Sequence, residues 1–309
     1  FTRMDGKKFE GEFLIETEHI YDNGVFTGYF CNHPPVGKGY LITREGKYFG
    51  EVRRELLPEG YGSSVQTDGT KYVGYWENGH PEGMGAYIFL PESTYEGMFH
   101  NGMPEGHGIY TFADKATADC GGWTYVDRMN INDRKTFYSG MAYLKKGLLG
   151  VKTVPCGRGT IRWQDTGESY VGEVRRFQPN GYGVHTLGLG STFSGMWKDG
   201  SIKENTQGVY QFKHSGQKLS GNWKCVSYLE IRNSEQLQSR FYYTGTMCRN
   251  NQEEWMITGD GILYDSQKRK KYRGEFLNGS FHGYGAIFNS KEEVSESGIW
   301  EYGQLVQKD

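Results

Sequence analysis

The chain has almost no net charge, few prolines and no long apolar run. Its 35 basic and 37 acidic residues leave a formal charge of −2, so no general field draws it to nucleic acid, and we expect no nucleic-acid partner. No run approaches the roughly 18 apolar residues of a membrane helix, so the sequence predicts no transmembrane span. Eight prolines in 309 residues, together with many aromatic residues, argue against a disordered chain.

Paired cysteines and metal-ligand spacings are also absent from the sequence. The five cysteines are widely spaced and none belongs to a C-x-x-C pair, which favours reduced thiols and a cytoplasmic location over a disulfide framework or a zinc site. The histidines show no H-x-x-x-H or H-E-x-x-H spacing, and no phosphate-binding glycine loop is complete. We therefore expect no catalytic residues, no metal ion and no cofactor, and hence no enzyme.

Glycine and aromatic residues are abundant instead, with 46 glycines, 23 tyrosines, 17 phenylalanines and 7 tryptophans. They recur as one pattern: aromatic, any residue, glycine, any residue, aromatic or apolar. The central glycines are separated by about 23 to 24 residues. We take the rings and glycines of five clear copies as structural anchors of a repeat: Tyr72, Gly74 and Trp76; Tyr95, Gly97 and Phe99; Tyr170 and Gly172; Phe193, Gly195 and Trp197; Tyr272, Gly274 and Phe276.

A second motif predicts a second strand in each repeat. Gly-x-Gly pairs such as 83–85 and 106–108 follow the first motif and lead into β-prone runs. Four dipeptides that supply the positive φ of a tight hairpin turn lie between the two strands. These dipeptides are Asn78-Gly79, Asn101-Gly102, Asp199-Gly200 and Asn278-Gly279. The repeat is therefore predicted to be a β-hairpin.

Alternation along a strand places the two rings and the glycine of each copy on one face. The glycine leaves bare backbone between two rings, and we expect a ring of the neighbouring hairpin to lie there. A lone hairpin is marginally stable, so the repeats must stack on one another. The sequence thus predicts an all-β fold, an elongated single-layer solenoid of tandem antiparallel β-hairpins.

Together, the aromatic-x-Gly-x-aromatic strand, the Asn-Gly turn and the Gly-x-Gly strand resemble the MORN (membrane occupation and recognition nexus) repeat. The resemblance extends from Phe9 to about Gly303 and implies one array of about 12 repeats over residues 1–309. Degenerate or inserted stretches are expected at about 113–137, 144–156 and 226–241, the last with a helical turn or two over residues 234–240.

The resemblance implies three alternative functions. The first is a non-enzymatic scaffold or adaptor that binds other proteins in a cytoskeletal assembly, most simply a ciliary or axonemal one of the radial-spoke kind. The second is a peripheral membrane tether that binds acidic phospholipid. The third, suggested by a start at Phe1 rather than Met, is the regulatory array of a larger enzyme such as a lipid kinase. Association of two arrays through their ends, as a homodimer, is a further expectation.

Basic residues are the candidate partner or lipid contacts. Arg53-Arg54 and Arg175-Arg176 follow Gly-Glu-Val in the same register of their repeats, and Lys268-Arg269-Lys270-Lys271 is the densest basic cluster. Cations near a membrane surface contribute about 1 kcal/mol each toward anionic lipid. The sequence leaves a solvated turn and a protein contact open as the other interpretations of these residues.

Overall fold

The computed structural model describes residues 13–21, 24–32, 35–53, 56–131, 135–147, 150–232, 240–250 and 252–309. Every regular element among these residues is a β-strand, and none is a helix. The strands are β1 (Phe13–Tyr21), β2 (Gly24–Asn32), β3 (Pro35–Ile42), β4 (Gly46–Arg53), β5 (Pro58–Gln66), β6 (Lys71–Glu77), β7 (His80–Phe89), β8 (Ser93–His100), β9 (Met103–Thr111), β10 (Thr117–Asn130), β11 (Thr136–Gly147), β12 (Gly150–Trp163), β13 (Glu168–Arg175), β14 (Gln178–Thr186), β15 (Thr192–Lys198), β16 (Ser201–Ile202), β17 (Thr206–Gln211), β18 (Lys218–Arg232), β19 (Arg240–Arg249), β20 (Trp255–Tyr264), β21 (Lys270–Leu277), β22 (Ser280–Phe288), β23 (Val294–Glu301) and β24 (Gln304–Lys308).

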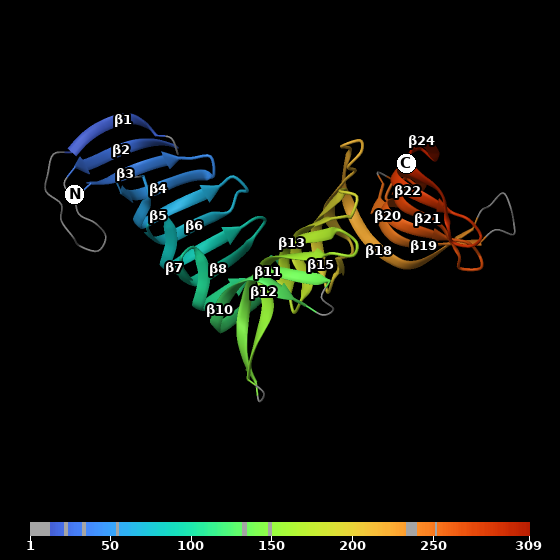
Figure 1. Ribbon diagram of the computed structural model, residues 1–309, viewed down its shortest axis with the longest axis horizontal. Coiled ribbons are helices and arrows are strands. Elements are labelled where there is room, and N and C mark those ends of the chain that lie inside the picture. The colour runs from blue at the N-terminus through green and yellow to red at the C-terminus, as the bar shows by residue number, and fades with distance from the viewer. Residues whose placement is uncertain are drawn as a thin grey trace. The chain divides into compact units, whose positions relative to one another are not determined.

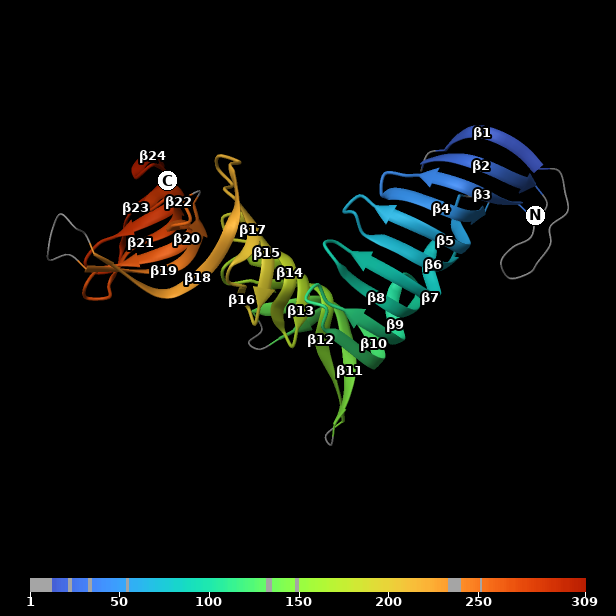
Figure 2. The same cartoon turned by 180° about the vertical axis from the view of Figure 1, so that it is seen from behind.

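The strands belong to one open antiparallel sheet. β1 to β10 pair in chain order. β13 to β24 do so as well, with β15 pairing to both the short β16 and β17. Figures 1 and 2 show this succession most clearly over β3 to β9. The predicted all-β array of tandem hairpins is confirmed.

The chain divides into two compact units. Unit 1 comprises residues 1–127 and 139–157, and unit 2 comprises residues 128–138 and 158–309. The helical segment expected over residues 234–240 lies almost entirely outside the described residues, because β18 continues to Arg232 and β19 begins at Arg240. That expectation stays a prediction, and only Arg240, the first residue of β19, is described.

The Asn-Gly dipeptides form the tight turns that their composition predicts. Asn78 and Gly79 have φ of 50° and 86°, and Asn278 and Gly279 have φ of 49° and 85°, values that suit a two-residue hairpin turn. Each turn also bonds to the preceding hairpin, since the Gly79 amide donates to the Pro58 carbonyl at 2.9 Å. The same bond recurs at Gly102, Gly200 and Gly279, so the turns connect successive hairpins.

The first aromatic ring of each repeat covers two glycines of its own hairpin. A Cβ added at Gly74 would lie 2.8 Å from Tyr72 Cζ, and one added at Gly85 would lie 2.6 Å from the same atom. Gly74 and Gly85 face each other across β6 and β7. Tyr48, Tyr95, Tyr170, Tyr243 and Tyr272 cover glycine pairs in the same way. The expectation that a ring fills the gap in the neighbouring hairpin was therefore wrong, because each ring lies over the glycines of its own hairpin.

A hydrogen bond explains why this first ring is a tyrosine. The pairing of β6 with β7 is interrupted between Gly74 and Trp76, and the Tyr72 hydroxyl donates to the carbonyl of the intervening Tyr75 at 2.9 Å. The bonds from Tyr95 to Met98, Tyr170 to Glu173, Tyr243 to Thr246 and Tyr272 to Glu275 follow the same rule. The hydroxyl thus satisfies a carbonyl that the irregular pairing leaves without a ladder partner.

The repeat that begins with Phe193 has no tyrosine hydroxyl to satisfy the corresponding carbonyl. Phe193 covers Gly195 and Gly208 but has no hydroxyl. Here the carbonyl of Met196 accepts a bond from the Lys203 backbone amide at 2.8 Å instead. A phenylalanine is tolerated because the carbonyl has another donor.

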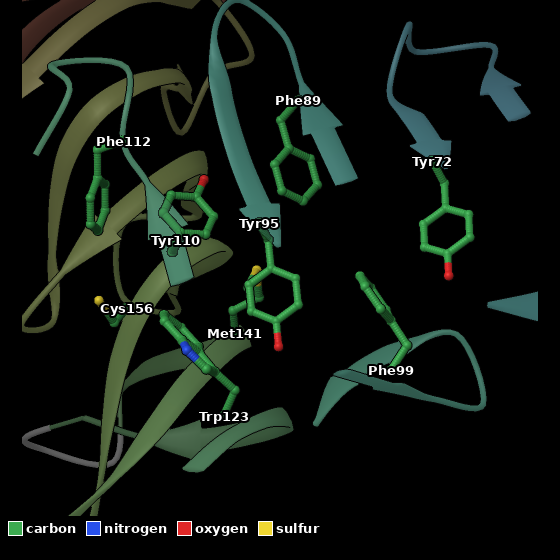
Figure 3. Close-up of a cluster of buried hydrophobic side chains, with 9 residues drawn as sticks. All are labelled: Tyr72, Phe89, Tyr95, Phe99, Tyr110, Phe112, Trp123, Met141 and Cys156. Carbon is green, nitrogen blue, oxygen red and sulfur yellow. The ribbon is translucent and has the colours of Figure 1, made fainter. Parts of the chain in front are cut away.

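The second aromatic residue of a repeat packs between hairpins. Phe99 lies edge-on to both Tyr72 and Tyr95, with centroids 5.1 and 5.2 Å away. Where this residue is tryptophan, its indole N–H can also donate to the preceding Gly-x-Gly strand, as from Trp123 to the Gly108 carbonyl at 2.7 Å. Trp197, Trp223 and Trp300 make equivalent bonds. Figure 3 shows the resulting aromatic cluster of unit 1.

Each unit contains a further tyrosine that packs on a more distant strand. In unit 1, Tyr110 bonds to Ser93 Oγ at 3.0 Å, and its ring lies 3.1 Å from a Cβ placed on Gly157. In unit 2, Tyr210 bonds to Glu275 Oε1 at 2.8 Å, and its ring lies 3.2 Å from a Cβ placed on Gly259. Both units therefore fold back on themselves through a tyrosine and a glycine.

Replacing Tyr72 with phenylalanine tests the role of the hydroxyl. The ring remains, but the Tyr75 carbonyl loses its donor, so we expect the free energy of unfolding to fall by about 1 kcal/mol. Urea denaturation followed by tryptophan fluorescence measures this loss. Tyr61→Phe, at a half-exposed tyrosine of the same unit, is the matched control and should change stability by less than about 0.5 kcal/mol. Equal losses in the two variants would contradict the assigned role.

Replacing Gly85 with alanine tests the cover that the ring gives to the glycines. The new methyl group would push against the Tyr72 ring, so we expect a loss of about 1 to 3 kcal/mol. Gly122→Ala is the control, because its Cβ would meet Leu144 Cβ at an ordinary 3.4 Å. Thermal unfolding measures the stability of both variants. A Gly85→Ala variant as stable as the wild type would show that the Tyr72 ring does not cover Gly85.

Candidate functional site

The second face of the unit 1 sheet carries large apolar side chains that remain exposed. They alternate with the buried rings, so that Tyr75 lies between Gly74 and Trp76, and Met84 lies beside Gly85. Met84 is 58% exposed and Tyr75 is 50% exposed. We call this surface the outer apolar face, and it comprises Tyr40, Phe49, Tyr61, Val65, Tyr75, Met84, Ile88, Met98 and Ile109.

Cross-strand pairing brings these side chains together in neighbouring strands. Tyr40 faces Phe49 with ring centroids 4.5 Å apart, and Tyr61 faces Tyr75 at 5.5 Å. Met84 is directly opposite Met98. The pairs come from β3 to β8, so apolar contacts extend across successive hairpins rather than along one strand.

Two lysines lie in one row of this face. Lys47 and Lys71 both face Val65, from β4 and β6 respectively, and both are exposed. An exposed apolar surface beside charged residues is typical of a protein interaction site. The geometry offers contact area and a local positive charge.

The predicted contact Arg53 is held within unit 1. Its guanidinium forms an ion pair with Glu59 Oε1 at 2.8 Å and donates to Asn78 Oδ1 at 2.9 Å. Glu59 also accepts from the Asn78 backbone amide at 3.2 Å. Arg53 therefore connects two hairpins, while Arg54 lies outside the described residues.

Arg175 ends β13 in unit 2, and Arg176 follows it in the turn to β14. Arg175 is half-buried, and the exposed Arg176 has a φ of 49° followed by 73° at Phe177. Arg176 and Phe177 therefore form a tight turn, and this turn lacks the Asn-Gly signal that identified the predicted turns. The sequence pattern therefore missed the turn, although the Gly-Glu-Val motif located the strand.

The basic cluster at 268–271 lies around the turn between β20 and β21. Arg269 pairs with Asp265 at 2.9 Å, and Lys270 Nζ lies 4.9 Å over the Phe288 ring. Lys268 is exposed and Lys271 is half-buried. Although burial alone would raise it, the pKa of Asp265 is lowered by hydrogen bonds from Arg269 and Gln267. Part of the cluster's charge is thus balanced within the protein.

Buried carboxylates are the polar residues that the sequence pattern did not single out. Glu173 accepts from the Tyr182 amide at 2.8 Å, and Glu275 accepts from the Tyr284 amide at 2.8 Å. Glu51 is buried at the same repeat position. The recurrence of Gly-Glu before an apolar residue at 50–52, 172–174 and 274–276 was the available signal. The bonds of Glu173 and Glu275 join neighbouring strands, so these two carboxylates have a structural role.

Two further properties concern metal ions and membranes. Within the described ranges, no three histidine, cysteine or acidic side chains are grouped so that they could hold a metal ion. The same part of the chain contains no helix with the length and apolarity needed to cross a membrane.

Tandem antiparallel hairpins whose tyrosines cover glycine pairs define a class of repeat proteins. Three segments, 72–89, 95–117 and 272–286, match the family model described as MORN repeat. The chain therefore contains MORN repeats in both units, and such repeats are typical of proteins that serve protein or membrane interaction and are mostly non-catalytic. No curated protein matches the chain.

The engagement of Arg53, Arg269 and Lys270 within the protein leads to a prediction about lipid. Vesicles that contain phosphatidylserine should retain no more of the protein than vesicles of phosphatidylcholine alone. Lys270→Glu combined with Lys271→Glu should leave co-sedimentation unchanged. Retention that depends on acidic lipid and is lost in this double variant would instead support a membrane tether.

Proposed function

We propose that this chain is a non-enzymatic scaffold that binds a partner protein through the outer apolar face of unit 1. The observation that carries the proposal is the exposure of Tyr75, Met84 and their neighbours on a sheet face that no other described element of unit 1 covers. Large apolar side chains of this kind are stabilised when a partner removes them from water, by about 25 cal/mol per Å² of apolar area.

The chemistry of this face indicates the partner segment. Methionine and tyrosine adapt to varied apolar partners while keeping some polar character. Lys47 and Lys71 favour acidic residues at one side of the bound segment, which would steer its approach. The matching partner is an amphipathic segment with apolar residues on one side and glutamate or aspartate beside them.

The cellular setting of the proposal is a cytoskeletal assembly in the cytoplasm, of the ciliary or axonemal kind. This part rests on the resemblance of the repeats to those of ciliary proteins. Imaging of a tagged chain in ciliated cells tests it, and a diffuse distribution with no enrichment at the axoneme would overturn the ciliary setting without affecting the binding face.

The binding face is tested by charge placed on the two methionines. Met84→Asp combined with Met98→Asp should weaken partner binding at least tenfold, because the apolar contact would be replaced by two hydrated carboxylates. Both side chains are exposed, so the free energy of unfolding should change by less than about 0.5 kcal/mol. Quantitative affinity purification from ciliated cells, followed by titration of the purified partner, measures the effect.

A matched control comes from the same unit. Val151 is 59% exposed but lies on β12, apart from the strands β3 to β9 that carry the outer apolar face, so Val151→Asp should retain the partner. Lys47→Glu combined with Lys71→Glu should weaken an acidic partner. A partner set that is identical for the wild type and the Met84 and Met98 double variant would refute the assignment of this face.

A further inference from the structure

Unit 2 contains a half-open cavity of about 360 Å³ that no repeat motif accounts for. Strands β20 to β23 contribute Asp260, Arg273, Ala286 and Ser297 to its lining, and Glu168 contributes from the start of β13. The turn before β15 adds Leu187, Gly188, Leu189 and Ser191. Its volume lies near the lower end of the range for ligand sites, about 300 to 1,000 Å³. A cavity of this size suits one side chain of a partner or a small ligand.

The cavity exists because unit 2 folds back on itself. Tyr210 on β17 reaches Glu275 on β21, and the rings of Phe212 and His282 meet at 5.0 Å. Ser191, which lines the cavity, is held by a bond from the Lys213 amide at 2.9 Å. The walls of the cavity are therefore fixed by contacts made elsewhere in the unit.

Part of the lining is backbone. Gly274 and Gly285, the pair that Tyr272 covers from its own side, contribute only backbone atoms to the cavity, and Ala286 contributes a single methyl group. A Cβ at Gly188 would collide with the Thr166 carbonyl oxygen, so the two turns of the wall lie in close contact. Leu187 and Leu189 provide an apolar side to the same space.

Negative charge predominates in the lining. Its ionisable groups are Glu168, Asp260 and Glu275 against the guanidinium of Arg273. The carboxylate of Glu275 already accepts hydrogen bonds from the Tyr210 hydroxyl and from the Tyr284 amide. Glu168 contacts His185 Nε2 at 3.1 Å. The carboxylate of Asp260 has no hydrogen bond or ion pair with any other residue in the described ranges.

We propose that this cavity binds the arginine side chain of a partner peptide, whose guanidinium pairs with the carboxylates of Asp260 and Glu168. A planar guanidinium makes directional bonds to carboxylates, and its methylene stem would lie along Leu187 and Leu189. Arg273 is exposed and competes for the same carboxylate without forming an ion pair to it. The site is separate from the outer apolar face, so either can fail without the other.

The protonation of Asp260 fits this assignment. Burial, with the nearby carboxylates of Glu275 and Glu168, raises the pKa of Asp260 to about 6, against the opposing effects of Arg273 and His185. A bound cation would favour the ionised carboxylate. Below this pKa the carboxylate becomes neutral and loses its attraction for a guanidinium ligand, so binding should weaken from pH 7.5 to pH 5.

Two synthetic peptides test the proposal on the full chain. Acetyl-Leu-Arg-Leu-amide and its citrulline counterpart differ in charge but hardly in shape, and isothermal titration gives their dissociation constants. We expect the arginine peptide to bind at least tenfold more tightly at pH 7.5. Equal affinities, or no detectable binding of the arginine peptide, would overturn the proposal.

Three variants assign the effect to the cavity. Asp260→Asn, which keeps the side-chain shape, should abolish the preference for arginine, and Arg273→Gln should tighten arginine binding severalfold by removing the competing cation. Asp127→Asn, at an exposed carboxylate of unit 1, should change nothing. A preference that survives Asp260→Asn, or binding that weakens in Arg273→Gln, would contradict the assigned roles, and circular dichroism confirms that each variant is folded.

Discussion

The structure depends on one local interaction, a tyrosine ring that lies over a pair of facing glycines in its own hairpin. The ring of Tyr72 is fully buried although the sheet has a single layer, because Gly74 and Gly85 leave room for it against the backbone. Its hydroxyl then satisfies the carbonyl at which the strand pairing is interrupted. Burial of the ring and satisfaction of a backbone polar group are thus achieved by the same side chain, which explains why a hairpin of this size can form a stable unit.

Stacking of hairpins follows from the second aromatic position. Phe99 contacts the tyrosines of two successive repeats, and each such pair contributes about 0.5 to 1.5 kcal/mol beyond its buried area. The tight turns add a backbone bond to the hairpin before them, as at Gly79. The aromatic contacts lie on one face of the sheet and the turn bonds lie at one edge, so the stacking of hairpins does not use the outer apolar face. The exposed residues of the outer apolar face therefore need no structural role, and a partner is the simplest reason for their apolar character.

Much of the fold followed from the spacing of residues, and the limits have physical causes. Period-two alternation placed the rings and glycines on one face, and Asn78-Gly79 indicated its turn. Alternation does not say which neighbour on that face a ring will touch, so the cover of a glycine such as Gly74 was expected from a ring of the neighbouring hairpin, and it comes from Tyr72 of the same strand. The contact of Tyr210 with Glu275 joins residues 65 positions apart and depends on how the sheet curves. The cavity beside Asp260 arises from that curvature and has no sequence signal of its own. The ion pair of Arg53 with Glu59 likewise has no signal in the sequence, because it depends on how the two strands pack.

A double-mutant cycle on a second repeat would decide whether ring and glycine act as a pair. Tyr95 covers Gly108, and a Cβ there would lie 2.6 Å from Tyr95 Cζ. Gly108→Ala should lower the free energy of unfolding clearly when Tyr95 is present and cost little in a Tyr95→Ala background, giving a coupling of about 1 kcal/mol or more. The same cost for Gly108→Ala in both backgrounds would mean that the tyrosine does not occupy the space above the glycines, and the pairing of ring and glycine could not be what holds the hairpins together.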